Sequence, residues 1–170
     1  RFRAHAFFLN VRLHTASVTA LQEALKFHMV LDQVKRAVAE ATEADVSESL
    51  VQKALASACH ERGLAVEDLG LVYRAEISAG RVVSRDIWGR FSKDLRHALA
   101  DRRLLLAGKA AGWPSLRAAW ISVLQMPVLV RESAPRGWAR HAQLGAAEAA
   151  AIADAAWAAR PPRKASVEDL

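Results

Sequence analysis

A basic ridge is the feature of this sequence with the clearest chemistry. It consists of four cations that fall together on one side of a helix predicted over residues 86–107, namely Arg85, Lys93, Arg96 and Arg103. Guanidinium groups bind phosphate through paired hydrogen bonds, and cations at this spacing can follow a nucleic-acid backbone. Further arginines flank the ridge and widen the predicted surface: Arg81, Arg90, Arg117, Arg136 and Arg140. The pattern predicts backbone binding without base specificity, with RNA favoured over DNA.

Tryptophan side chains in the same part of the chain could hold unpaired bases. Trp113 and Trp138 stand beside Gly or Pro in predicted loops, and they are the candidates for stacking on bases. Trp88 and Trp120 fall instead at positions where the helical periodicity predicts core. On the predicted helix over 86–107, the apolar side would be formed by Ile87, Trp88, Phe91, Leu95, Ala98 and Leu99.

Charge is distributed unevenly along the chain. Residues 74–140 hold thirteen Lys and Arg against five Asp and Glu, whereas residues 15–70 hold five against nine, in a chain of net charge +6. This asymmetry predicts an electrically two-sided molecule whose basic half meets a polyanion. Two partners fit: a nucleic acid in a ribonucleoprotein or a similar assembly, or an acidic protein surface on which an adaptor subunit docks. A solvated basic face without a partner is a third interpretation.

Signals for catalysis are few. The sequence has no phosphate-binding glycine loop, and no two of its six histidines fall four residues apart at the helical spacing of metal ligands. No cofactor, no metal site and no catalytic residue is therefore expected. A small metal-free enzyme with an unrecognised site is the alternative, and it would require His97, His141 or Cys59 to meet a carboxylate in a pocket.

Compartment is indicated only in outline. The sequence has a single cysteine, Cys59, and no apolar run of the ~20 residues needed to cross a bilayer. These features favour a reducing intracellular compartment, with the cytoplasm ahead of an organelle matrix. Residues 1–14 carry three Arg and no acidic residue. Such a segment is either the remnant of a targeting sequence or the first element of the fold.

Apolar periodicity and helix caps predict a mainly α fold, a bundle-like single domain of about five helices over 1–159 with a flexible tail over 160–170. Thr19 and Asp45 are the expected caps of the first two helices, Gly63 and Gly108 the expected stops, and Pro114 an expected first-turn residue. Alternation predicts a short hairpin near 71–83 and a loop or edge strand over 128–137. The predicted helices span residues 16–41, 46–62, 86–107, 114–125 and 139–159.

A winged helix is a further alternative, with the helix over 46–62 as the recognition helix and residues 71–83 as the wing. The charge argues against it, because that helix offers only Lys53 and Arg62 to a duplex.

Overall fold

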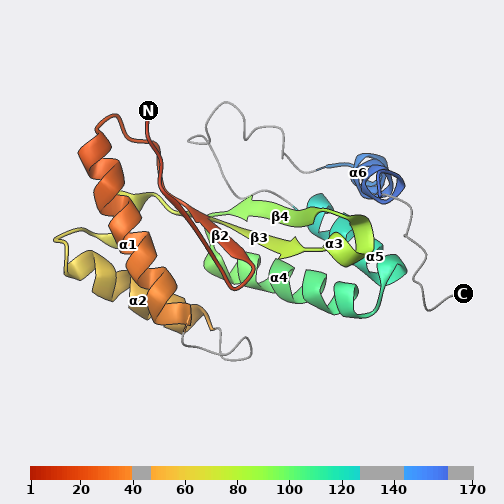
Figure 1. The fold of residues 1–170 in the computed structure, drawn as a ribbon, viewed down its shortest axis with the longest axis horizontal. Helices are drawn as coiled ribbons and strands as arrows, with labels where there is room; N and C mark the ends of the chain where they lie inside the picture. Colours follow the sequence, from red (N-terminus) through yellow and green to blue (C-terminus); the bar gives the residue numbers. More distant parts are fainter. Residues whose placement is uncertain (40–46, 127–143, 161–170) are drawn as a thin grey trace, which may run out of the picture.

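The computed structural model describes residues 1–39, 47–126 and 144–160, and these residues form a mixed α/β fold. They contain six α-helices and a four-stranded antiparallel sheet (Figure 1), so the prediction of a mainly helical bundle is wrong. The strands are β1 (His5–Phe8), β2 (Val11–His14), β3 (Val72–Ser78) and β4 (Asp86–Ser92). The helices are α1 (Leu21–Ala39), α2 (Glu48–His60), α3 (Gly80–Val83), α4 (Leu95–Ala110), α5 (Trp113–Gln125) and α6 (Ala146–Ala158), with a 3₁₀ turn, η1, at Val66–Leu69.

The sheet has the strand order β1-β2-β3-β4. Residues 1–14 contribute its first hairpin, whose two turn residues, Leu9 and Asn10, have φ of +48° and +60°. Positive φ at both turn positions matches the right-handed twist of the paired strands. Arg102 fixes the tip of the hairpin, because its Nε donates a 2.6 Å hydrogen bond to the Leu9 carbonyl.

The largest error in the predicted elements falls on residues 86–107. Their first third is not helix but the strand β4, and α4 begins only at Leu95, where the Asp94 side chain accepts a 2.9 Å hydrogen bond from the backbone N–H of Arg96. The hairpin predicted near 71–83 is right in its first strand, β3. Its expected second strand, residues 81–83, lies in the single turn of α3, and the chain returns as β4.

A β-bulge in β4 explains its misleading sequence pattern. Arg74 is the register partner of Phe91, and Glu76 is the partner of Trp88, so Gly89 and Arg90 together stand opposite one residue of β3. The extra residue puts Trp88 and Phe91, three positions apart, on the same side of the strand. Residues three positions apart also lie on the same face of a helix, and for this reason the sequence pattern favoured a helix here.

The helices pack against one face of the sheet. Two clusters of buried side chains cover this inner face, and β3 contributes to both, with Tyr73 in the first and with Ala75 and Ile77 in the second. The first cluster joins the sheet to α1, α2 and the start of α4, and the second joins it to the rest of α4, α5 and α6. Figure 1 shows α1 and α2 at one end of the sheet and α5 and α6 at the other.

The first two helices form where their periodicity predicts. Ser47 provides the N-cap of α2 by accepting from the backbone N–H of Leu50, whereas the expected cap, Asp45, lies outside the described residues. Gly63 turns the chain after α2 with φ of +63°. Leu21 and Leu25, two large apolar residues near the start of α1, are 54% and 51% exposed. Both lie on the side of α1 away from its buried residues.

The last three helices cross closely. Gly108 does not end α4: it lies inside the helix, where a Cβ would stand 3.0 Å from the Leu116 backbone of α5. Pro114 lies in the first turn of α5 as predicted, and the Ala-rich helix α6 packs closely on its neighbour through fully buried Ala149 and Ala153. None of the helices in the described ranges is long and apolar enough to cross a membrane. The loop or strand predicted over 128–137 and the tail after 160 lie outside the described residues.

Candidate nucleic-acid interface

The basic ridge does not exist as a continuous helical surface. Arg85 and Lys93 precede α4, at the two ends of β4, and only Arg96 and Arg103 lie on the helix itself. The four side chains are all exposed, but a strand and a turn separate them. The physical reason is the bulged strand, which replaces the first turns of the predicted helix.

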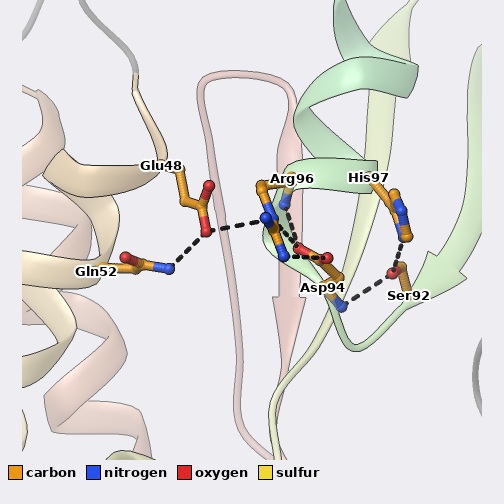
Figure 2. A network of polar contacts seen from close by, with 6 residues as sticks. All are labelled: Glu48, Gln52, Ser92, Asp94, Arg96 and His97. Carbon is orange, nitrogen blue, oxygen red and sulfur yellow. Dashed lines mark hydrogen bonds and ion pairs between the residues drawn. The ribbon is translucent and has the colours of Figure 1, made fainter.

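Arg96 is held by carboxylates on two elements. Figure 2 shows its guanidinium between Asp94, whose Oδ2 lies 3.2 Å from Arg96 Nη2, and Glu48 of α2, whose Oε1 lies 3.7 Å from Arg96 Nε. Gln52 donates a 2.7 Å hydrogen bond to the same Glu48 oxygen. Asp94 and Glu48 raise the pKa of Arg96. The side chain therefore joins the N-termini of α2 and α4, and it is a poorer candidate for phosphate than the sequence suggested.

Two of the flanking arginines also form ion pairs with carboxylates of this chain, one buried and one exposed. Arg90 is buried with its Nε 3.3 Å from Asp101 Oδ2, and Arg117 donates hydrogen bonds of 2.6 and 2.8 Å to Asp154. Burial raises the pKa of Asp101 to about 6, although the Arg90 charge opposes this. The remaining flanking residue that the structure describes, Arg81, is exposed on α3. Two predicted contacts, Arg136 and Arg140, lie outside the described residues.

The tryptophans have different neighbours from those expected. Trp113 stacks on Trp157 of α6, with ring centroids 4.6 Å apart and an 8° interplanar angle, so this ring already has an aromatic partner. Trp120 is fully buried, as predicted. Trp88 is half-buried on β4, and its carbonyl accepts a 3.0 Å hydrogen bond from Trp120 Nε1. The other stacking candidate, Trp138, lies outside the described residues.

A different basic and aromatic surface lies on the outer face of the sheet, opposite the helices. This outer face comprises the side chains that alternate with the core positions: His5, Phe7, Arg12, His14, Arg74, Glu76, Trp88 and Phe91. Strand pairing aligns four of them as a cross-strand row, because Phe7 is the partner of Arg12, Arg12 of Arg74, and Arg74 of Phe91. With strands ~4.8 Å apart, the cross-strand row runs roughly 14 Å from β1 to β4.

One carboxylate holds the two arginines of the cross-strand row. Arg12 donates to both oxygens of Glu76, from Nε at 2.7 Å and from Nη2 at 2.5 Å, and Arg74 donates from Nη2 at 2.7 Å. The hydrogen bonds from Arg12, and then those from Arg74, lower the pKa of Glu76, while burial opposes them. The side chains of Arg12, Arg74 and Glu76 are 26%, 18% and 12% exposed. This Arg–Glu–Arg group keeps one net positive charge.

Aromatic rings lie against these guanidinium groups. Arg12 Cζ lies 5.3 Å from the centre of the Phe7 ring, and Arg74 Cζ lies 4.8 Å from the Phe91 ring and 5.9 Å from the Trp88 ring. Arg85 adds a second cation over Trp88 at 5.3 Å. Cation–π contacts fix the direction of the side chains and leave the charge available to an anion. The outer face thus combines oriented cations with planar rings.

Comparisons with protein-family models, with curated proteins and with solved structures find no match for this chain. A fold by itself would not define an activity, so the function has to be inferred from the side chains of the outer face.

Of the three residues proposed for the enzymatic alternative, the structure describes His97 on α4 and Cys59 on α2. His97 Nδ1 lies 3.4 Å from Ser92 Oγ, but Ser92 is buried, and its Oγ accepts from the Asp94 backbone N–H at the start of α4 (Figure 2). Cys59 is buried in the first cluster, and burial raises the pKa of its thiol. The third candidate, His141, lies outside the described residues. Among the residues that the structure describes, no three of His, Cys, Asp and Glu gather as a possible metal site.

Sequence reasoning missed the centre of the outer face because it did not pair residues 5–14 with residues 72–78. Two signals were present: Phe7 and Arg12 in an early segment without acids, and the alternation of Arg74 and Glu76 with apolar residues. Alternation shows that these side chains share a face of one strand. Only the strand register shows that Arg12 and Arg74 are neighbours.

Proposed function

We propose that this chain binds single-stranded nucleic acid on the outer face of its sheet and that it acts as a non-catalytic binding module. The observation that carries the proposal is the cross-strand row, in which Phe7 and Phe91 flank two arginines that share one carboxylate. Aromatic rings stack on unpaired bases of any sequence, and oriented guanidinium groups contact the phosphates between them. Recognition would be of the backbone and of exposed bases, without base specificity.

Accessibility on the two edge strands supports this assignment. Phe7 on β1 is 39% exposed and so presents its ring to solvent. On β4, Trp88 is half-buried beside the exposed Arg85. A strand of nucleic acid crossing the sheet would meet Phe7 first, then the two arginines, and then Trp88 on β4, because Phe91 is only 6% exposed and lies against Arg74. A duplex would keep its bases stacked and would gain nothing from the rings.

The direct test is fluorescence anisotropy of labelled U20 RNA, T20 DNA and a 20-base-pair duplex across a salt series. Both single strands should bind more tightly than the duplex, with log K falling by ~0.7 per log unit of salt for each phosphate neutralised. A 20-residue poly-glutamate peptide serves as the competitor for the protein-docking alternative. Tighter binding of the duplex, or equal competition by poly-glutamate, would contradict the proposal.

Matched variants locate the surface. Phe7→Ala should weaken U20 binding by about fivefold or more, because a stacked base contributes ~1–3 kcal/mol. Phe2→Ala is the control, since Phe2 is similarly exposed, 43% against 39%, but lies outside the cross-strand row. Arg85→Gln should weaken binding and Arg103→Gln should not, although both remove one exposed cation. Equal effects within each pair would show that binding is on another surface.

A further inference from the structure

His14 lies at the end of β2 among the cations of the outer face. Its ring meets the Phe91 ring edge-on at 5.7 Å, and it lies 6.1 Å from the ring of its strand partner His5. The groups that act on it electrostatically are basic: Arg74 from β3, Arg3 from the segment before β1, Arg12 from β2 itself, and His5 from β1. Glu76, a carboxylate of the outer face, is bonded to Arg12 and Arg74.

The electrostatic state of His14 follows from this environment. Burial, and after it the charges of Arg74, Arg3 and Arg12, lower the pKa of His14 to about 4. The imidazole is therefore neutral at pH 7. An anion placed among these groups would reverse the balance, because its charge offsets the arginines and its oxygen can accept a hydrogen bond from imidazolium.

The two arginines of the cross-strand row keep donors for such an anion. Arg12 uses Nε and Nη2 on Glu76, and Arg74 uses Nη2. Each guanidinium keeps its Nη1, which donates none of these hydrogen bonds. Arg12, Arg74 and Glu76 together carry a single positive charge, which one phosphodiester neutralises.

Resting on the function proposed above, we infer that Arg12 and Arg74 hold a phosphate group of the bound strand beside His14, and that His14 takes up a proton when this phosphate is seated. Binding is then linked to pH through one residue. The proton comes from solvent, and the imidazolium donates to a phosphate oxygen. Affinity for the strand rises as the pH falls from 7.5 towards 5, because protonation of His14 costs less in the complex than in the free protein.

The decisive measurement is the NMR titration of the His14 ring in the intact protein, with and without saturating U20. His14→Gln assigns the resonance by its disappearance. The midpoint should move up by about two pH units when U20 is bound, because the phosphate charge offsets the arginines around the imidazole. A midpoint that stays near 4 with U20 bound would overturn the inference.

Affinity provides an independent readout. U20 binding to the native chain should tighten by roughly threefold or more from pH 7.5 to 5.5, whereas His14→Gln should bind with a flatter pH dependence. His60→Gln is the matched control, because His60 is exposed at the end of α2, away from the outer face. An unchanged pH dependence in His14→Gln would also overturn the inference.

Failure of this inference is distinguishable from failure of the proposed function. If U20 binds through Phe7 but the His14 titration does not move, the phosphate lies elsewhere and the binding surface stands. If no polymer binds but millimolar inorganic phosphate raises the His14 midpoint, the phosphate site stands and its natural ligand is a small phosphate compound. If neither U20 nor inorganic phosphate moves the midpoint, the phosphate site is wrong.

Discussion

Arg12 and Arg74 face each other across β2 and β3, and both donate to the same carboxylate, that of Glu76. Like charges directly opposite on neighbouring strands repel each other and destabilise a sheet. Glu76 offsets that repulsion and also sets the direction of both guanidinium groups. The pair can therefore be kept on the outer face at a modest cost in stability.

Glu76→Gln should separate the stability of the sheet from its affinity for nucleic acid. The amide keeps the shape of the side chain but loses the charge, so stability should fall by roughly 1–3 kcal/mol, typical of lost hydrogen bonds to a charged group. The same change frees one positive charge, so U20 binding at low salt should tighten. Urea unfolding and anisotropy measure the two effects. Glu23→Gln, on the exposed first turn of α1, should change neither, and a Glu76→Gln protein with native stability would show that the group is not structural.

Stability should depend on pH through His14 and Asp101, whose contributions change in opposite directions as the pH falls. The pKa of His14 is lowered to about 4, so between pH 6.5 and 4 the unfolded chain binds a proton that the folded chain does not, and stability falls as the pH falls. The pKa of Asp101 is raised to about 6, so between pH 6 and 3.8 the folded chain binds the extra proton, and stability rises as the pH falls.

Variants should expose these two contributions by urea unfolding at pH 6.5 and pH 4.5. Relative to the native chain, His14→Gln should gain stability on acidification and Asp101→Asn should lose it. Each comparison uses the change between the two pH values, so the cost of the substitution itself cancels. Parallel profiles for the native chain and His14→Gln would show that His14 titrates normally in the folded protein.

How far the sequence predicts this fold depends on the distance along the chain over which each signal acts. Local signals succeeded: helical periodicity located α1 and α2, and Pro114 marked the first turn of α5. The prediction failed for β4, because the bulge in this strand gives Trp88 and Phe91 the spacing of residues on one face of a helix. Two residues contradicted that helix: Gly89, a weak helix former in its first turn, and Asp94, a strong N-cap five residues later.

The candidate interface was predictable only in its chemistry. Arg and aromatic residues were the right types, but the basic ridge placed them on one helix, whereas the outer face draws them from four strands. Arg12 and Arg74 become neighbours because β2 pairs with β3, although α1 and α2 lie between these strands in the sequence. Such long-range pairing has no local sequence signal. Ion pairs such as Arg90 with Asp101 likewise depend on tertiary packing and remove a cation from the expected surface.

The crossing of α4 and α5 should depend on the missing side chain at Gly108. A Cβ there would lie 3.0 Å from both Ala119 Cβ and the Leu116 backbone, so Gly108→Ala forces the helices apart. The overpacking cost of about 1–3 kcal/mol should exceed the ~1 kcal/mol that alanine gains in helix propensity. Thermal unfolding measures the net loss. Gly80→Ala is the control, because the nearest atom to its Cβ would be 3.9 Å away, and a stabilised Gly108→Ala protein would contradict the close crossing.

Attachment of α6 should depend more on its aromatic contact than on its exposed ion pair. Trp157 stacks on Trp113 at 4.6 Å and carries Arg160 over its ring, so Trp157→Ala removes a large contact from a helix whose other buried residues include three alanines, Ala149, Ala153 and Ala156. The expected loss is about 1–3 kcal/mol. Asp154→Asn breaks the pair with Arg117 at an exposed position, where solvent screens the charges, and it should cost less. Urea unfolding followed by circular dichroism at 222 nm compares the two variants, and a larger loss in Asp154→Asn would show that α6 is held by charge.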